Sequence, residues 1–249
     1  MLRSPNACPV RWETFVPCAA RYRFVDTHRG IARKEIMDIK GIIFDLDGVI
    51  VFTDHYHYLA WKMIADEMGI YFDETINNRL RGVSRMESLE IILENYHGAP
   101  LSDEEKVALA EKKNNFYREL LQEMSPASVA PEVRSTLQTL RERGYKLSIG
   151  SSSKNTKTIL ERVQLTDAFD TISDGTNITR SKPDPEVFQK AAQFLGLNAE
   201  NCAVIEDAFA GIDAACAAGM ISVGIGDASG YDKATYHIHK FDELLNIFN

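Results

Sequence analysis

Apolar runs and segments with helical spacing alternate through most of this 249-residue chain. Short runs with the length of a strand lie at 40–45, 146–150, 169–173, 202–206 and 221–225. Segments with helical spacing lie at 131–143, 155–164, 185–195 and 208–218, and a shorter one lies at 241–248. Alternation of this kind builds a parallel sheet that helices cover on both faces. We therefore expect an α/β fold with a doubly wound (Rossmann-like) parallel sheet at its core.

A block without strand-like runs interrupts this alternation after the first strand. Its helical segments lie at 54–69, 73–80, 85–96 and 103–124. Ser84 and Ser102 are each followed three residues later by glutamate, which is the pattern of a capping box at a helix start. We expect an inserted all-helical cap domain at 54–125, on a core domain made of 37–53 and 126–249.

The first 36 residues differ from the rest. They hold seven Lys/Arg against three acidic residues and show no clear periodicity. An Arg-rich start is typical of a transit peptide, but the prolines and Trp12 disfavour an amphipathic helix. We expect 1–36 to be a poorly structured extension. Met37 remains an alternative start of translation.

Charge and composition exclude some classes of function. The net charge of −8 argues against a nucleic-acid partner, because phosphate backbones need a basic surface. No apolar stretch has the length of a membrane span. The four cysteines lack metal-ligand spacing. Nothing implies disulfides either, which favours a reducing compartment. We expect a cytoplasmic protein, monomeric, with no membrane partner.

Two aspartates follow the first apolar run, in the segment Phe44-Asp45-Leu46-Asp47-Gly48. Residues i and i+2 of an extended segment point the same way, so Asp45 and Asp47 can face one substrate together. A carboxylate nucleophile, a nearby acid/base and a divalent ion are typical of phosphoryl transfer through an aspartyl-phosphate. Such a pair also occurs on solvated loops, so the rest of the chain must decide.

Polar residues gather where other strands end, which is where ligands bind in open α/β sheets. Ser151 to Asn155 follow the run at 146–150, Lys182 lies in a proline-rich turn, and Glu206-Asp207 end the run at 202–206. Each has another interpretation. A serine caps helices, a lysine is usually solvated, and acids favour a helix start. Together they indicate a site.

This arrangement resembles the haloacid dehalogenase superfamily from residue 40 to 226. The resemblance implies that Asp45 is the nucleophile and Asp47 the general acid/base. It also implies that Ser151 and Lys182 hold the phosphoryl oxygens. The implied cofactor is Mg²⁺, with the ligands Asp45, Asp47 through its main-chain carbonyl, Glu206 and Asp207.

Within the cap, Thr53 to Lys62, Leu80 to Leu89 and Lys112-Lys113-Asn114 resemble the β-phosphoglucomutase family. That family converts β-glucose 1-phosphate to glucose 6-phosphate, with glucose 1,6-bisphosphate as the priming phosphate donor. The resemblance implies sugar-phosphate substrates and assigns Arg85 and Ser88 to a second phosphate. The substrate-binding positions that it implies are Thr53, His57, Trp61, Gly82, Val83, Ser84, Arg85, Ser88, Lys113, Asn114, Ser153, Lys154 and Asn155.

Several alternatives stay open. Arg85 could open its helix and face water, Ser84 could be an N-cap alone, and His57 and Trp61 could be a packed pair. Val51-Phe52 departs from the polar residues common there in the family. The rival functions are a sugar-phosphate phosphatase and, less favoured, a non-catalytic phosphosugar-binding protein.

Overall fold

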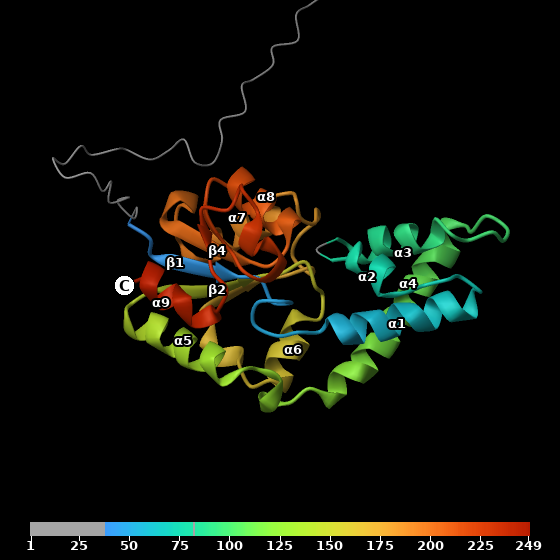
Figure 1. The fold of residues 1–249 in the computed structure, drawn as a ribbon, viewed down its shortest axis with the longest axis horizontal. Helices are drawn as coiled ribbons and strands as arrows, with labels where there is room; N and C mark the ends of the chain where they lie inside the picture. Colours follow the sequence, from blue (N-terminus) through green and yellow to red (C-terminus); the bar gives the residue numbers. More distant parts are fainter. Residues whose placement is uncertain (1–37, 82) are drawn as a thin grey trace, which may run out of the picture.

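A parallel sheet forms the centre of the larger part of the molecule (Figure 1). The computed structural model describes residues 38–81 and 83–249, so the expectations for the extension 1–36, Met37 and Gly82 lie outside the described residues. The strands are β1 (Gly41–Phe44), β2 (Lys146–Gly150), β3 (Thr171–Ser173), β4 (Cys202–Glu206), β5 (Ile221–Gly224) and β6 (Tyr236–His237). Among the described residues they form one sheet in the order β3-β2-β1-β4-β5-β6. The doubly wound α/β core is confirmed.

Strand β1 occupies the middle of the sheet. Gly41 pairs with Lys146 of β2 on one side and with Cys202 of β4 on the other. The chain runs from β1 to β2 and β3 on one side and then crosses back to β4 on the other side of β1, so the strand order reverses at this point. Ligands bind at such a switch point, beyond the carboxyl ends of the strands.

The helices are α1 (Asp54–Glu67), α2 (Glu74–Asn78), α3 (Arg85–Leu93), α4 (Asp103–Leu120), α5 (Pro131–Glu142), α6 (Thr156–Arg162), α7 (Glu186–Leu195), α8 (Phe209–Ala217) and α9 (Leu244–Ile247). Helices α5, α6 and α9 cover one face of the sheet, and α7 and α8 cover the other. Successive side chains of a strand point to opposite faces, so β1 supplies both layers. Ile42 and Phe44 pack in the first layer, and Ile43 packs in the second.

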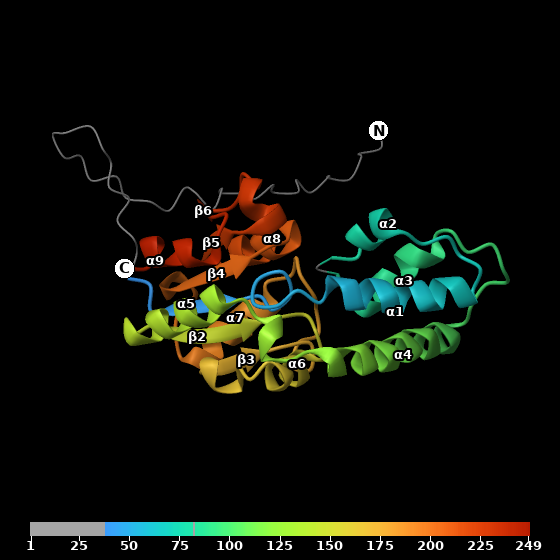
Figure 2. The ribbon, with the colours of Figure 1, turned by 60° about the horizontal axis from the view of Figure 1, so that its bottom comes forward.

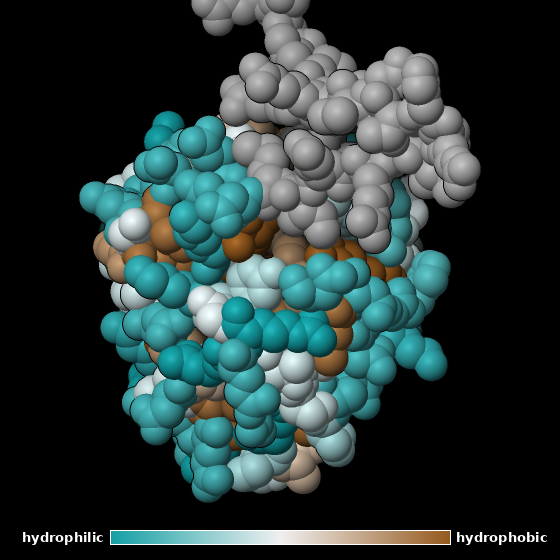
Figure 3. Space-filling view, turned by 90° about the vertical axis from the view of Figure 1, so that its left-hand side faces the viewer, coloured by the Kyte–Doolittle hydropathy of each residue, from teal (hydrophilic) through white to brown (hydrophobic). Residues whose placement is uncertain are grey.

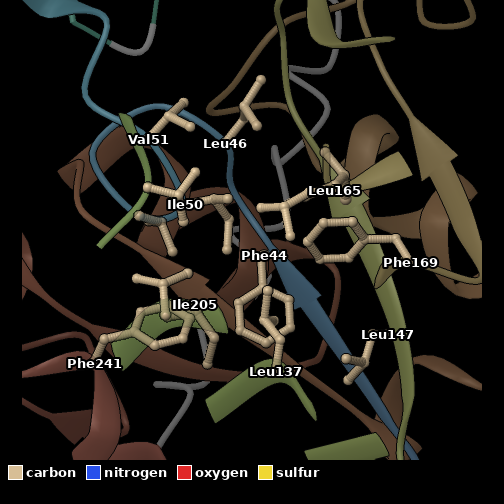
Figure 4. Close-up of a cluster of buried hydrophobic side chains, with 14 of the residues drawn as sticks. Phe44, Leu46, Ile50, Val51, Leu137, Leu147, Leu165, Phe169, Ile205 and Phe241 are labelled. Atoms are coloured by element: carbon tan, nitrogen blue, oxygen red, sulfur yellow. The ribbon is translucent and has the colours of Figure 1, made fainter. Parts of the chain in front are cut away.

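The larger core cluster anchors the loop that carries the two aspartates (Figure 4). Phe44 stacks on Phe241 with ring centroids 5.8 Å apart, and it meets Phe169 edge-on at 6.1 Å. Leu46 lies between Asp45 and Asp47 and is fully buried in the same cluster. Burying Leu46 turns its two neighbours toward the other side of the chain, as expected for an extended segment.

Helices α1 to α4 form a separate helical body, called the cap below, beside the carboxyl ends of the strands (Figures 1 and 2). The cap has its own apolar cluster, with Trp61, Ile64, Leu89 and Ile92 among its buried members. Helices α3 and α4 both begin with the expected capping boxes, at Ser84 and Ser102.

Element ends differ from the expectations by a few residues. The helix expected to reach residue 124 ends at Leu120, and a 3-10 turn, Leu121–Glu123, follows it. The strand expected at 169–173 begins at Thr171, and β6 was not expected at all. Strand β6 has two residues, which is too short for an alternation to be visible in the sequence.

The described surface at the end of the core away from the cap is mostly hydrophilic (Figure 3). None of the described helices combines the length and the apolar character that a membrane crossing requires.

Candidate active site

A cavity of about 670 Å³ lies between the cap and the carboxyl ends of the strands. Among the described residues, its lining includes all the positions expected from the sequence except Thr53: Asp45, Asp47, His57, Trp61, Val83, Ser84, Arg85, Ser88, Lys113, Asn114, Ser151, Ser153, Lys154, Asn155, Lys182, Glu206 and Asp207. Thr53 is fully buried and does not line the cavity. The fold therefore brings residues from both bodies to one place, while their roles remain predictions.

Three carboxylates meet on the core side of the cavity. Asp45 follows β1, and Glu206 and Asp207 lie at the end of β4. One oxygen from each lies within 4.8 Å of the other two. Carboxylate oxygens are the donors that Mg²⁺ prefers, so the residues present fit that ion. The Asp47 side chain is not part of this group, which leaves the main-chain carbonyl as its expected contribution.

Two glycines make this close arrangement possible. A Cβ on Gly211 of α8 would overlap the carboxyl group of Glu206, and a Cβ on Gly48 would overlap that of Asp207. Gly48 also has a φ of +79°, which L side chains rarely adopt. Burial raises the pKa of both Glu206 and Asp207, and neighbouring carboxylates add to the effect.

Lys182 lies inside the carboxylate group. Its Nζ is 2.7 Å from Asp45 Oδ1 and also donates to Glu206 Oε1. Burial alone would lower the pKa of Lys182, but the two carboxylates outweigh this and raise it. The Lys182 side chain is 2% exposed. The alternative of a solvated surface lysine is therefore wrong.

Asp47 is held by the hinge between core and cap. Its Oδ1 accepts from the Thr53 hydroxyl and, at 3.1 Å, from the Thr53 main-chain N–H. Tyr117 of α4 donates to the Thr53 hydroxyl at 3.0 Å. Desolvation raises the pKa of Asp47 to about 6, with Thr53 opposing the rise and Asp45 adding to it.

His57 connects Asp47 to the cap interior. Lys113 Nζ lies 2.8 Å from His57 Nδ1, and His57 Nε2 lies 3.9 Å from Asp47 Oδ2. Burial, Lys113 and Arg85 hold the pKa of His57 well below its usual value, so the ring is neutral. When Lys113 is charged it can only donate to Nδ1, and this places the ring proton on Nε2, the nitrogen on the side of Asp47. Lys113 also lies over the rings of Trp61 and Tyr117.

On the cap side, two donors converge on one oxygen. Arg85 Nη2 donates to Asn114 Oδ1 at 2.7 Å, and Asn155 Nδ2 from the core donates to the same atom at 2.9 Å. Arg85 lines the cavity, so the alternative in which it merely faces water is wrong. Ser84 is an N-cap, as expected, and it also lines the cavity.

The serine loop after β2 is held by short-range hydrogen bonds. Ser151 N–H donates to the Ser173 carbonyl at 3.0 Å, and Ser151 Oγ accepts from Ser153 N–H at 3.2 Å. Asn155 N–H donates to Ser153 Oγ at 3.2 Å. These serines therefore hold the loop, whereas the N-cap position of α6 is Asn155.

Two groups in this region were not expected from the sequence. Tyr117 lies four residues after Lys113, so helical spacing could have placed both on one face. Arg81 bonds Asp54 and Asp227, and its partner in the core is 146 residues away. No rule of sequence spacing indicates the pairing of Arg81 with Asp227.

A model of the haloacid dehalogenase-like hydrolase family matches residues 39–219. The chain belongs to this family. Among haloacid dehalogenase relatives, the β-phosphoglucomutase of Bacillus subtilis is 44% identical over 190 residues, which cover 76% of this chain and 84% of that protein. The fructose-1-phosphate phosphatase of Escherichia coli is 31% identical over 186 residues, covering 74% and 95%.

Solved structures of haloacid dehalogenase proteins agree with this placement. The crystal structure of β-phosphoglucomutase from Clostridium difficile superposes with a TM-score of 0.78 at 42% identity, covering 83% of this chain and 93% of that chain. The helical cap on a parallel core is thus shared with a solved structure. Relatives of this chain include both mutases and phosphatases of phosphorylated sugars.

Proposed function

We propose that this protein is a β-phosphoglucomutase. It interconverts β-glucose 1-phosphate and glucose 6-phosphate through glucose 1,6-bisphosphate and a phosphorylated Asp45, and glucose 1,6-bisphosphate primes the cycle. The proposal is supported by the resemblance of the cap segments and by the 44% identity to a β-phosphoglucomutase.

The observation that carries the proposal is the convergence of Arg85 and Asn155 on Asn114 Oδ1. A carboxamide oxygen occupies the position that an anion's oxygen would take between these donors. A guanidinium matches two phosphate oxygens at once. This group consists of other residues than the Asp45–Lys182 group, and we assign a second anion to it. A sugar bisphosphate needs both, whereas hydrolysis of a monophosphate needs one.

Charge on the cap side supports the same conclusion. Burial and the neighbouring Arg85 lower the pKa of Lys113 to about 7. Two crowded cations favour an anion between them, because the anion restores the charged form of the lysine. The second phosphate would supply that anion.

The chemical step uses the core residues. Asp45 attacks phosphorus, the ester P–O bond breaks, and the departing sugar oxygen takes a proton from Asp47. In the reverse sense a sugar hydroxyl attacks the aspartyl-phosphate, its proton goes to Asp47, and the bond to Asp45 breaks. Lys182 and Ser151 hold the phosphoryl oxygens. Mg²⁺, held by Asp45, Glu206, Asp207 and the Asp47 carbonyl, would offset negative charge when bound.

The cap residues decide what accepts the phosphoryl group. Arg85, Lys113 and Asn155 hold the distal phosphate, so the sugar's hydroxyl lies at Asp45 in place of water. After transfer the bisphosphate reorients in the cavity, and Asp45 takes the other phosphate. The closed cap excludes water, which would otherwise hydrolyse the aspartyl-phosphate.

The test is a two-arm assay on β-glucose 1-phosphate with Mg²⁺ and a trace of glucose 1,6-bisphosphate. One arm follows glucose 6-phosphate through a coupled dehydrogenase, and the other follows inorganic phosphate. Glucose 6-phosphate should form far faster than phosphate. Phosphate as the sole product would instead support a sugar-phosphate phosphatase, the activity named for the relative at 31% identity.

A further inference from the structure

Arg81 joins the cap to the core at one rim of the cavity. It lies in the loop between α2 and α3, and it lines the cavity together with Asp54 and Asp227. Its Nη2 is 3.1 Å from Asp54 Oδ2, at the start of α1. Its Nη1 is 2.6 Å from Asp227 Oδ2, in the core loop Gly226–Gly230. One guanidinium therefore bonds both bodies: the cap at the start of α1, and the core at Asp227.

On the cap side of this contact, Asp54 is held by a hydrogen bond within the cap. Asp54 Oδ1 accepts from Asn77 Nδ2 at 3.1 Å, and Asn77 is buried at the end of α2. Asp54 thus holds the guanidinium in place within the cap. The bond to Asp227 is then the part of the contact that forms or breaks when cap and core move relative to each other.

The core side is tied to the carboxylate group. Ala228 N–H, next to Asp227, donates to the Asp207 carbonyl at 2.9 Å, and Ile225 N–H donates to the Glu206 carbonyl at 2.9 Å. The loop that Arg81 grips is therefore bonded to the same main chain that positions the acidic pair. Asn114 and Asn155 provide a second hydrogen bond between cap and core, from α4 to the serine loop, and it carries no formal charge.

We propose that Arg81 is a positioning residue whose charge pair with Asp227 holds the cap closed over the cavity. By doing so it limits the access of water to phosphorylated Asp45. The limit on water access rests on the proposed function, whereas the closed position of the cap concerns the conformation alone.

The expected effect is modest and depends on salt. Arg81 is 38% and Asp227 69% exposed, and exposed ion pairs contribute little. We expect loss of the pair to raise the ratio of open to closed molecules by about two- to fivefold. Salt screens such a pair strongly, with a Debye length of about 3 Å at 1 M.

The experiment compares the full chain with Asp227→Asn, Asp227→Glu and Glu94→Gln by small-angle X-ray scattering at low and at 1 M salt. Glu94 is the matched control, because it forms an exposed 2.7 Å pair with Arg79 within the cap. Asp227→Asn should have a larger radius of gyration than wild type at low salt, and wild type should approach it at 1 M salt. Asp227→Glu and Glu94→Gln should behave as wild type. Equal radii for wild type and Asp227→Asn at low salt would overturn the proposal.

The two-arm assay adds a chemical reading with the same variants. The ratio of phosphate released to glucose 6-phosphate formed should rise two- to fivefold in Asp227→Asn and stay unchanged in Glu94→Gln. An unchanged ratio in Asp227→Asn would overturn the statement about water. If all variants released phosphate alone, the mutase proposal would fail, while the scattering result would still decide the role of Arg81.

Discussion

Lys113 is buried beside another cation, so its protonation should control binding of the second phosphate. Its pKa in the free protein is about 7 because of burial and Arg85. Above pH 7 Lys113 is mostly uncharged in the free protein, so binding of a dianion is accompanied by uptake of a proton from solvent. The affinity for the phosphate therefore falls as pH rises. We expect the Kd for glucose 6-phosphate, measured by calorimetry, to rise roughly tenfold between pH 7 and pH 8.5. Lys113→Met should bind more weakly and lose this slope, and a slope unchanged in that variant would assign the titration elsewhere.

Linkage gives a second consequence of the same pKa. The lysine loses its proton more easily in the folded than in the unfolded chain, where its pKa is near 10.5. The folded state therefore binds fewer protons between about pH 7 and 10.5, and stability rises with pH across that window. Below about pH 7 the charged lysine destabilises the free protein by a constant amount.

Substitution of Arg85 tests the two proposed phosphate sites separately. Arg85→Ala should still allow phosphorylation of Asp45, which intact-mass measurement after treatment with glucose 1,6-bisphosphate would detect. It should lower the rate of glucose 6-phosphate formation by roughly 10²-fold, because a bidentate anchor of the distal phosphate is lost. Asp45→Asn should gain no mass and show no turnover. A mutase rate in Arg85→Ala equal to wild type would contradict the two-site proposal.

Residue types and spacing indicated the polar residues on the core side of the cavity, whereas the positions on the cap side were implied by the family resemblance. Asp45 and Glu206 were predictable because the first follows a strand and the second ends one, and strands of a parallel sheet end at one edge. Tyr117 was missed because a tyrosine on an amphipathic helix is usually read as core. Arg81 was missed because its partner Asp227 depends on how two bodies are placed.

At the scale of elements, Gly211 allows α8 to pack closely against the end of β4, because glycine has no Cβ. A Cβ there would overlap the Glu206 carboxyl group, which is fully buried and accepts hydrogen bonds from Lys182 and from the Ala208 N–H. Gly211→Ala should lower the free energy of unfolding in urea by about 1–3 kcal/mol, as overpacking does. It should also weaken stabilisation by Mg²⁺.

Gly230 provides the control for this substitution, because an added Cβ there has no described neighbour within 4 Å. Gly230→Ala should stay within about 0.5 kcal/mol of wild type. Equal stability of the two variants would show that α8 can shift away from β4.

Element types were predictable, whereas element ends were not. Capping boxes marked the start of α3 and α4 correctly, because the cap is a local interaction. The end of α4 was missed because Leu121–Glu123 continues the helical spacing with a tighter turn. Strand β6 depends on pairing with β5, which the local sequence does not encode.

For the molecule as a whole, the carboxylate group should couple metal binding to stability. Asp45, Glu206 and Asp207 face one lysine, so the site has an excess of negative charge without a cation. Mg²⁺ at a hundred times its Kd should raise the free energy of unfolding by about 2.7 kcal/mol. Chelation should abolish turnover in both arms of the assay.

Asp207→Asn tests the coupling. It should remove most of the Mg²⁺ effect on thermal unfolding and, by relieving repulsion, stabilise the metal-free protein by roughly 1 kcal/mol. Asp213→Asn, which breaks a pair with Lys233 of 2.7 Å, should keep the full Mg²⁺ response. An undiminished response in Asp207→Asn would place the ion elsewhere.

The central place of β1 also orders events during synthesis. Its first pairing partner, β2, lies beyond the whole cap in the chain, and β4 lies further still. The cap has its own apolar cluster, so it can fold on the ribosome while β1 still has no partner strand. Asp45, the proposed nucleophile, precedes all the other core strands in the chain and is therefore among the last residues to reach its final surroundings. A nascent chain that stops before Glu206 can therefore carry a folded cap while it lacks the carboxylate group proposed to act in phosphoryl transfer.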